Sequence, residues 1–341
     1  MAAVAERRTL YPAFEPYETG FLQRGSRGQH KIYYEVSGNP TGRPVMIVHG
    51  GPGGGSQPYY RQYFDATAYK LVMFDQRGCG KSEPAASLDE NTTWDLVEDM
   101  EALRKHTKIS HKMMLFGGSW GSCLSLAYAQ TYPQNVAALV LRGIFTLRRS
   151  ELEWFYQVGN HHGELLNNAN IFPDAAEKFL EPIPLAERGD VISAYQRRLT
   201  GKDEEERLRC ARVWSVYEMS TSKLFVDPAY IARAADDDAF SLAFARIENH
   251  FFSHAGWFKT DGQLITDATM LENAGIPGVV VQGRYDCVCP TRSAYELCKR
   301  WPSAKLEIIA DAGHSCKEKG IIDGLVRATD SFRDLACPEW S

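Results

Sequence analysis

A serine between glycines, in the segment Gly-Gly-Ser-Trp-Gly at residues 117–121, is the most informative chemical feature of this sequence. An apolar run at 113–116 precedes it, and a helix-like stretch at 122–132 follows it. A sharp turn from a strand into a helix leaves no room for side chains at the two flanking positions, so glycine is needed there. The pattern therefore predicts a nucleophile elbow that exposes the hydroxyl of Ser119.

A serine hydroxyl becomes a good nucleophile only when an imidazole takes its proton and a carboxylate orients that imidazole. In hydrolases with such an elbow, these partners follow in the order acid and then histidine, each on a loop after a late strand. Here a buried-strand run at 279–283 leads to Asp286, and a shorter run at 306–309 leads to His314. We predict that Asp286 orients and His314 acts as the base, with Asp311 as the second candidate for the orienting acid.

An oxyanion hole needs two backbone N–H groups directed at the oxygen that becomes negative during acyl transfer. One donor is expected at Trp120, directly after the nucleophile. The other is expected in the glycine-rich segment 49–55, which follows the apolar run 45–48, and Gly51 is the best placed. Such a glycine cluster can also bind phosphate, but no nucleotide-binding helix pattern follows it.

Two other motifs point to different chemistry and fail on spacing. Residues 80–82 (Gly-Lys-Ser) end like a phosphate-binding loop, but that motif needs glycine at the position of Asp75. The cysteines Cys287, Cys289 and Cys316 lie near the predicted base, but their spacing is not that of a structural zinc site. A zinc ion there would also consume the base. We therefore expect no metal and no cofactor.

Composition is that of an ordinary globular protein: 341 residues, 44% hydrophobic, 24% charged and a net charge of −5. This charge gives no basic footprint for nucleic acid or an anionic membrane, so neither is an expected partner. The first eight residues lack the apolar core of a signal peptide, and no long apolar run occurs elsewhere. With eight scattered cysteines, best interpreted as reduced thiols, the sequence predicts a cytoplasmic protein.

Strand and helix patterns alternate along the chain, which predicts an α/β fold with a mostly parallel eight-stranded sheet flanked by helices. A helix is expected at 94–106, and Thr92 and Asp95 can form a capping box before it. The eight predicted strands cover residues 17–23, 31–36, 45–49, 71–75, 113–117, 138–142, 279–283 and 306–310.

Some 130 residues separate the sixth and seventh strands, which is too long for a simple connection. Helical patterns within this stretch predict an inserted cap over the catalytic loops. We assign residues 1–145 and 271–341 to the core and 146–270 to the cap. The predicted cap helices include residues 151–158, 191–199, 204–218 and 239–252.

Six segments together resemble the proline iminopeptidases, single-chain α/β-hydrolases that release N-terminal proline from peptides. The resemblance covers most of the chain. It implies a Ser-His-Asp mechanism through a prolyl acyl-enzyme, short peptides with a free N-terminal proline as substrates, and no cofactor. The segments that carry it are residues 49–53, 75–82, 117–121, 142–145, 246–250 and 283–286 with 313–314.

The resemblance also implies that two cap glutamates, Glu218 and Glu248, hold the charged amine of the substrate. A buried ammonium needs such a carboxylate partner. Two acids facing one cation leave an excess negative charge. Either one carboxyl is protonated when the site is empty, because like charges raise its pKa, or Arg142 or Arg246 lies near. The family usually has tryptophan where Tyr217 stands, a difference that affects the pocket wall.

Phe145 and Phe155 match positions in the family's aromatic pocket for the proline ring, although ordinary core packing would also explain them. Two other functions stay open at this point. One is a general carboxylesterase or small-amide hydrolase on the same core, in which Glu218 would matter little. The other is a binding protein that keeps the fold and a ligand pocket but hydrolyses nothing.

Overall fold

One eight-stranded sheet forms the centre of the molecule, in a computed structural model that describes residues 6–157 and 167–333. The strand order is β1-β2-β4-β3-β5-β6-β7-β8. The first two strands join the sheet antiparallel, and the other neighbours pair in parallel. All eight predicted strands and the predicted fold class are confirmed. The strands are β1 (Pro16–Arg24), β2 (His30–Gly38), β3 (Arg43–Val48), β4 (Tyr69–Phe74), β5 (Met113–Ser119), β6 (Val136–Ile144), β7 (Gly278–Gly283) and β8 (Ala304–Ile309).

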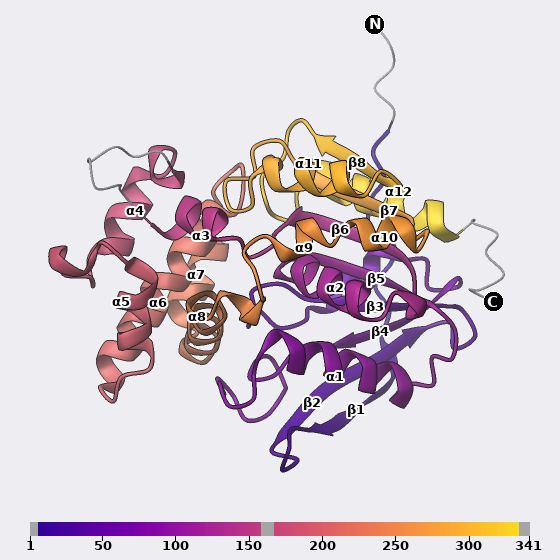
Figure 1. Ribbon diagram of the computed structural model, residues 1–341, viewed down its shortest axis with the longest axis horizontal. Coiled ribbons are helices and arrows are strands. Elements are labelled where there is room, and N and C mark those ends of the chain that lie inside the picture. Colours follow the sequence, from indigo (N-terminus) through magenta and orange to yellow (C-terminus); the bar gives the residue numbers. More distant parts are fainter. Residues whose placement is uncertain (1–5, 158–166, 334–341) are drawn as a thin grey trace, which may run out of the picture.

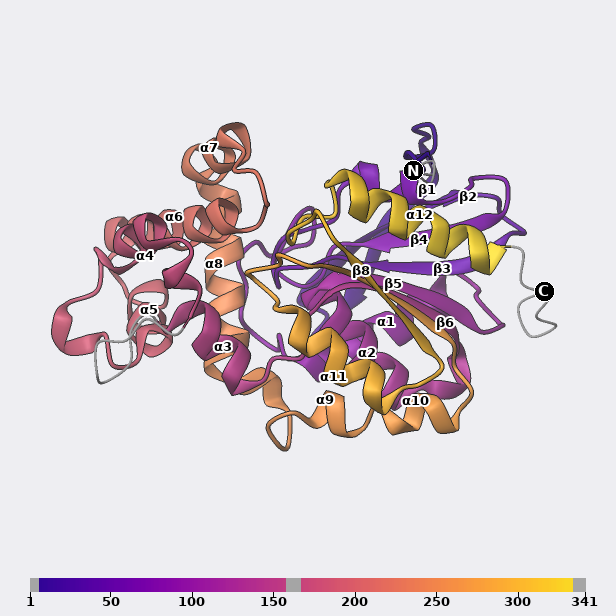
Figure 2. The ribbon, with the colours of Figure 1, turned by 90° about the horizontal axis from the view of Figure 1, so that it is seen from above.

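Helices cover both faces of the sheet (Figure 2), because successive strand side chains point to opposite faces and both sets are apolar. Met113 and Leu115 of β5 pack on the face covered by α1, α2 and α11, whereas Met114 and Phe116 pack on the face covered by α12. These helices are α1 (Thr93–His106), α2 (Trp120–Thr131), α11 (Thr291–Arg300) and α12 (Lys319–Arg333), and short α9 (Gln263–Thr266) and α10 (Thr269–Asn273) precede β7.

The predicted capping box at the start of α1 is present. The Thr92 hydroxyl accepts a hydrogen bond from the Asp95 amide at 3.2 Å, and the Asp95 carboxylate accepts one from the Thr92 amide at 3.0 Å. These two bonds satisfy donors that would be unpaired at a helix start. In the part of the chain that the structure describes, no helix is long and apolar enough to cross a membrane.

A group of helices between β6 and β7 lies beyond one end of the sheet (Figures 1 and 2), and we call α3 to α8 the cap. Helix α5 has the predicted bounds, while α6 and α8 are slightly longer than predicted. Helix α3 begins earlier than predicted and ends at Tyr156; residue 158 of that prediction lies outside the described residues. Helices α4 and α7 were not predicted. The cap helices are α3 (Arg149–Tyr156), α4 (Pro173–Leu180), α5 (Val191–Leu199), α6 (Glu204–Thr221), α7 (Pro228–Asp236) and α8 (Asp238–Ser253).

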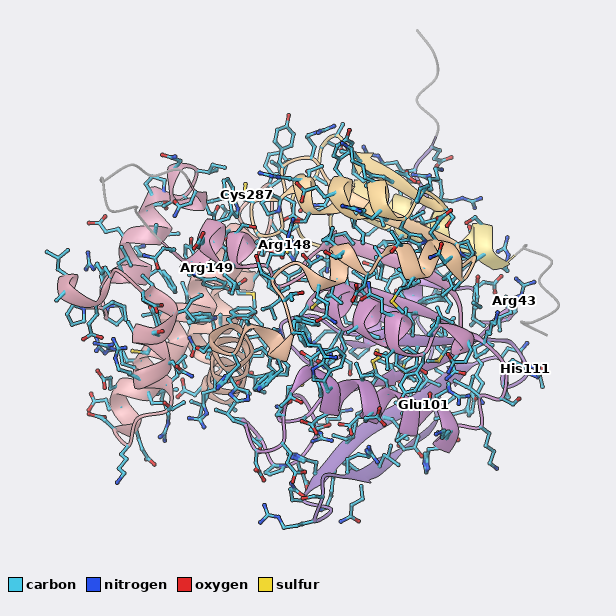
Figure 3. The ribbon with its side chains drawn as sticks, in the orientation of Figure 1. Arg43, Glu101, His111, Arg148, Arg149 and Cys287 are labelled. Atoms are coloured by element: carbon cyan, nitrogen blue, oxygen red, sulfur yellow. The ribbon has the colours of Figure 1, made fainter. Side chains whose placement is uncertain are left out.

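Polar contacts fix the cap to the core near the points where the chain enters and leaves it. Arg148, at the entry into α3 (Figure 3), pairs with Glu296 of α11 and with the buried Glu151. On the exit side, the indole N–H of Trp94 in α1 donates to the Trp257 carbonyl at 3.0 Å. The cap is therefore held at both of its ends, which restricts how far it can move from the sheet.

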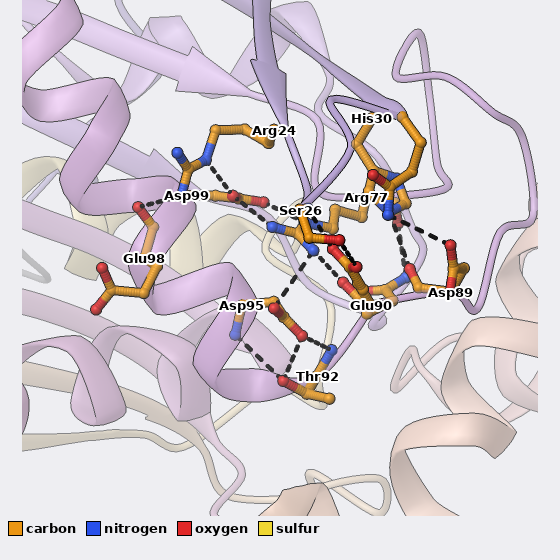
Figure 4. A network of polar contacts seen from close by, with 12 residues as sticks. Arg24, Ser26, His30, Arg77, Asp89, Glu90, Thr92, Asp95, Glu98 and Asp99 are labelled. Carbon is orange, nitrogen blue, oxygen red and sulfur yellow. Dashed lines mark hydrogen bonds and ion pairs between the residues drawn. The ribbon is translucent and has the colours of Figure 1, made fainter.

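A buried arginine organises the loop between β4 and α1 (Figure 4). Arg77 makes two hydrogen bonds to the Asp99 carboxylate, 2.6 Å from Nε and 2.8 Å from a terminal nitrogen, and also contacts the Glu90 carbonyl. Arg24 of β1 donates to the same carboxylate at 2.7 Å. Both Arg77 and Asp99 are almost fully buried, so their charges need compensation, and the two-bond contact between them is the closest that Arg77 makes to a carboxylate; Asp95 lies 3.5 Å away.

Replacing Asp99 tests this interpretation. We expect Asp99→Ala to lower the free energy of unfolding by about 3 to 5 kcal/mol, because the buried Arg77 guanidinium loses two charge-assisted hydrogen bonds and keeps only the more distant Asp95 carboxylate, at 3.5 Å. Urea denaturation followed by circular dichroism measures the change. Glu98→Ala, one residue away on the exposed side of α1, should cost less than about 1 kcal/mol. Equal losses for the two variants would contradict the assigned role.

Candidate active site

Ser119 sits at the junction of β5 and α2 in a backbone conformation that side chains rarely adopt, with φ 58° and ψ −128°. Space around this turn is very small. A Cβ atom on Gly121 would lie 2.2 Å from the Val48 carbonyl oxygen, and one on Gly117 would lie 2.3 Å from the Gly121 oxygen. Glycine is therefore required at both positions, and the turn leaves the Ser119 side chain lining a cavity.

Asp286 and His314 lie against each other, although 28 residues separate them in the chain. Nδ1 of His314 is 2.8 Å from Oδ2 of Asp286. The other carboxylate oxygen of Asp286 accepts bonds from the amides of Val288 and Cys289, at 3.1 and 2.7 Å, and Gln282 donates to Oδ2 at 3.1 Å. These donors hold the carboxylate in one orientation toward the imidazole.

The alternative prediction, that Asp311 orients the imidazole, is wrong. Its side chain is about half exposed and pairs with Arg7 at 2.8 Å. Three residues before His314, Asp311 lies at the end of β8 and faces the outside of the core, whereas Asp286 reaches the imidazole from the neighbouring loop after β7.

The other imidazole nitrogen contacts an arginine that sequence reasoning considered only as a partner for the glutamates. A terminal nitrogen of Arg142 in β6 is 3.0 Å from Nε2 of His314 and 2.9 Å from the His314 carbonyl oxygen. A guanidinium can only donate, so Nε2 accepts and the imidazole proton is on Nδ1, facing Asp286. Within the described ranges Ser119 Oγ has no hydrogen-bond partner, and serine and imidazole line the same cavity.

A short chain of hydrogen bonds joins the Trp120 side chain to His49, two residues before Gly51. The indole N–H of Trp120 donates to the Gln76 side chain at 2.8 Å, and that side chain donates to the His49 carbonyl at 2.9 Å. Trp120 is the first residue of α2, where backbone N–H groups lack a helical partner. Gly51, at φ 116°, lines the same cavity as Ser119. Gln76 was not predicted; its position depends on the loop after β4.

A cavity of about 150 Å³ is lined by residues that follow the carboxyl ends of the strands and by residues of the cap. It brings together Ser119, His314 and Gly51 from the core and Glu218 and Glu248 from the cap. A smaller hollow of about 20 Å³ adjoins it, which we call the aromatic recess. The recess shares Ser119, Gly51, Glu218 and Glu248 with the cavity, and its other lining residues are Phe145, Glu151, Phe155, Tyr156, Phe252, Val288 and Cys289.

The two cap glutamates come from facing helices, Glu218 from α6 and Glu248 from α8, and both are buried. Each has one donor. The Tyr156 hydroxyl bonds to Glu218, and the Trp214 indole N–H donates to Glu248 at 2.7 Å. The rings of these donors stack 4.6 Å apart at an interplanar angle of 16°. No sequence pattern predicted these two donors; the one available signal was that Trp214 lies one helical turn before Glu218.

Burial controls the charge of this pair. It raises the pKa of Glu218 from 4.5 to about 7, although the bond from Tyr156 acts in the opposite direction. The pKa of Glu248 is raised well above its usual value by burial and, secondly, by the charge of Glu218. Both carboxyl groups are therefore protonated in mildly acidic solution when the pocket is empty.

Of the two arginines considered as counter-charges, only Arg142 lines the cavity with the glutamates. The prediction that Arg246 lies near the glutamates is wrong, because its guanidinium donates to the carbonyl oxygens of Ala86 and Leu199 instead. Protonation of the empty pocket, the other alternative, agrees with the raised pKa values of both carboxyl groups.

Phe145 and Phe155 both line the aromatic recess and are buried. Tyr217, where the family usually has tryptophan, stands behind this wall. Its hydroxyl donates to the Phe155 carbonyl at 2.9 Å and accepts from the Asn168 amide at 3.2 Å. The substitution therefore changes the support of Phe155, while Tyr217 is not among the lining residues of either hollow.

The fold and this site define an alpha/beta hydrolase. A family model described as the alpha/beta hydrolase fold matches residues 43–320. Solved structures agree on the fold. A putative aryl esterase from Burkholderia cenocepacia has a TM-score of 0.60 at 18% identity, covering 93% of this chain and 97% of its own. A putative lipase from Acinetobacter baumannii has a TM-score of 0.58 at 14% identity, covering 92% and 89%.

Sequence relatives define the family more narrowly. A probable proline iminopeptidase of Leptolyngbya boryana is 54% identical over 325 residues, covering 95% of this chain and 97% of the relative. Proline iminopeptidases of Xylella fastidiosa and Arabidopsis thaliana are 52% and 48% identical, covering 95% and 96% of this chain and 99% and 83% of their own. The chain belongs to the proline iminopeptidase family, as its motifs predicted.

Titration of the buried pair should appear in the stability of the protein. Between pH 4.5 and about 7, Glu218 is ionised in the unfolded chain but protonated in the folded one, so stability falls as pH rises through this window. Glu218→Gln removes this dependence, which amounts to at most about 3.5 kcal/mol at about 1.4 kcal/mol per pKa unit. We expect the difference in melting temperature, Glu218→Gln minus wild type, to increase as the pH rises from 5 to 7.

Glu205→Gln is the matched control, because this glutamate is exposed on the same helix, α6. Its melting temperature should follow the wild-type pH profile. Parallel profiles for Glu218→Gln and the wild type would show that Glu218 titrates normally in the folded protein.

Proposed function

We propose that this protein releases N-terminal proline from short peptides through an acyl-enzyme on Ser119. The observation that carries this proposal is that two buried carboxyl groups, Glu218 and Glu248, share one cavity with Ser119 and His314. A general esterase has no use for buried acids beside its nucleophile, since burial of a carboxyl group is costly. Membership of the proline iminopeptidase family supports the same assignment.

Recognition starts with the amine of the substrate. An N-terminal amine is largely cationic at neutral pH and loses its water on entering the cavity. The carboxylates of Glu218 and Glu248 replace that water, and the proton that the empty pair carried returns to solvent. The amine is thus bound by a charge-assisted pair, which requires an unblocked N-terminus.

The chemical step follows from the positions of three side chains. Ser119 Oγ attacks the prolyl carbonyl carbon while its proton passes to Nε2 of His314, and Asp286 stabilises the resulting imidazolium. The N–H groups of Gly51 and Trp120 bind the oxygen that becomes negative. His314 then gives the proton to the departing peptide nitrogen, leaving a prolyl ester that water hydrolyses with the same imidazole as base.

Arg142 occupies Nε2 of His314 in the empty site, so this bond has to break before the imidazole can accept a proton from Ser119. Arg142 can keep its second contact, to the His314 carbonyl oxygen, while it does so. Catalytic hydrogen bonds commonly tighten only when substrate is bound.

The aromatic recess gives the proline ring its place. Phe145 and Phe155 line it and present apolar surface to a saturated ring. We assign selection of the substrate to the cap, residues 146–270, and the chemistry to the core, residues 1–145 and 271–341. The reaction as written needs only these side chains and water, and we place it in the cytoplasm.

Blocking the substrate amine tests recognition. The wild type should hydrolyse proline 4-nitroanilide and should hydrolyse its N-acetyl form at least about 100-fold more slowly in kcat/KM, because the acetylated nitrogen carries no charge for the glutamates. Release of 4-nitroaniline measures both rates. Comparable rates for the two compounds would refute recognition of the amine.

Two variants separate this activity from its alternatives. Glu248→Gln should lower kcat/KM for proline 4-nitroanilide by about 100-fold or more, since removing one partner of a buried pair costs about 3 to 5 kcal/mol. It should change hydrolysis of 4-nitrophenyl acetate, which has no amine, by less than about threefold. Ser119→Ala should abolish both reactions.

The outcomes that would contradict the proposed activity distinguish the two alternative functions. A Glu248→Gln variant with normal activity on proline 4-nitroanilide would favour a general esterase. A wild type that hydrolyses neither compound and is not labelled at Ser119 by a fluorophosphonate would favour a binding protein.

A further inference from the structure

Part of the cavity has no role in the proposed reaction. The proline ring and amine account for the recess and the two glutamates, but the cavity has further lining residues, and we call the region that they form the vestibule. None of its residues lines the recess. The vestibule is lined from the core by Gln57, Tyr59, Tyr60 and Lys317, and from the cap by Tyr230 and Phe244.

Lys317 is the cation of the vestibule and lies three residues after His314. Its ammonium is 4.4 Å from the centre of the Tyr59 ring. That ring is held in place by Cys316, because the Tyr59 hydroxyl is 3.2 Å from the Cys316 sulfur. Cys316 is itself fixed, since its carbonyl accepts a hydrogen bond from the Tyr63 hydroxyl at 2.7 Å. The ammonium therefore rests on an anchored aromatic surface at the cavity wall.

Lys317 forms no ion pair with any residue in the ranges that the structure describes, and nearby acids have other partners. Glu318 accepts hydrogen bonds from the amides of Gly313 and Ser315, at 2.9 and 3.2 Å. On the cap side, Lys223 is paired with Asp227. Among the vestibule residues, Lys317 is thus the available positive charge, and it does not line the recess.

We propose that Lys317 binds the C-terminal carboxylate of the substrate, and that the vestibule holds the one or two residues that follow proline in the peptide and depart as the leaving group. This inference rests on the proposed function. A short peptide is a zwitterion, with its amine at one end and its carboxylate at the other. The site has the matching arrangement, with acids in the recess and a cation in the vestibule, so the charges orient the scissile bond over Ser119.

The test compares Pro-Leu with Pro-leucinamide, which differ only in the terminal carboxylate. The readout is the ratio of their kcat/KM values, with proline 4-nitroanilide as a reference that lacks the carboxylate. We expect Lys317→Gln to lower the acid-to-amide ratio by about three- to fivefold, the upper part of the range for a solvent-exposed ion pair. Its kcat/KM for proline 4-nitroanilide should stay within about twofold of the wild type.

Lys317→Arg should keep an acid-to-amide ratio close to that of the wild type, because arginine keeps the positive charge. Lys319→Gln is the matched control: this lysine is exposed at the start of α12 and does not line the cavity, so its ratio should equal that of the wild type. Addition of 1 M salt should lower the wild-type ratio toward that of Lys317→Gln, because salt screens exposed charges.

An unchanged acid-to-amide ratio in Lys317→Gln would overturn the assignment of the carboxylate site, whatever the rates on proline 4-nitroanilide. Failure of the proposed function has a different result, namely that the wild type releases proline from none of the three compounds. A Lys317→Gln variant that fails to fold is recognised because it also loses activity on proline 4-nitroanilide. In that case the acid-to-amide ratio is compared between Lys317→Arg and the wild type at low and high salt, and a ratio that salt does not lower overturns the assignment.

Discussion

The strained backbone of Ser119 is the constraint on which the rest of the site depends. A non-glycine residue at φ 58° and ψ −128° costs roughly 1 to 3 kcal/mol, and it persists only where the surroundings enforce it. Here β5 lies at the centre of the sheet and α2 packs directly behind the turn. The same turn that lifts the serine hydroxyl into the cavity also places Trp120 at the helix start, so nucleophile and oxyanion donor are positioned by one local structure.

A second constraint is electrostatic and concerns the cap. Two buried carboxyl groups near each other cannot both be ionised in an empty pocket without a large cost. The raised pKa values of Glu218 and Glu248 relieve this cost, and one hydrogen-bond donor on each keeps the groups oriented. Tyr156 and Trp214 thus prepare a pocket that is close to neutral when empty and becomes anionic when a cation arrives.

The sequence predicted best what short-range patterns determine. The spacing of glycines around Ser119, the apolar strand runs and the Thr92–Asp95 box are local, and each element appeared where expected. The glutamates came only from family resemblance, because nothing in the α6 or α8 pattern distinguishes a buried glutamate from an exposed one. Both are buried, whereas Glu205 on the same helix as Glu218 is exposed.

What the sequence could not supply are contacts between distant segments. Arg142 meets His314 across 172 residues, and Gln76 joins Trp120 to His49 through a loop whose path depends on the whole sheet. The wrong choices have the same origin. Asp311 and Arg246 carry suitable charges at plausible positions, but their side chains face other partners in the folded chain.

The chain leaves the core after β6 to form the cap and returns to the core before β7. These two strands are neighbours in the sheet. An insertion whose ends meet on adjacent strands can be lengthened, shortened or replaced without changing strand order. Such a layout allows evolution to exchange the part that contacts the substrate while inheriting the turn around Ser119 unaltered. New substrate preferences can then arise from edits to a single inserted segment, without rebuilding the centre of the molecule.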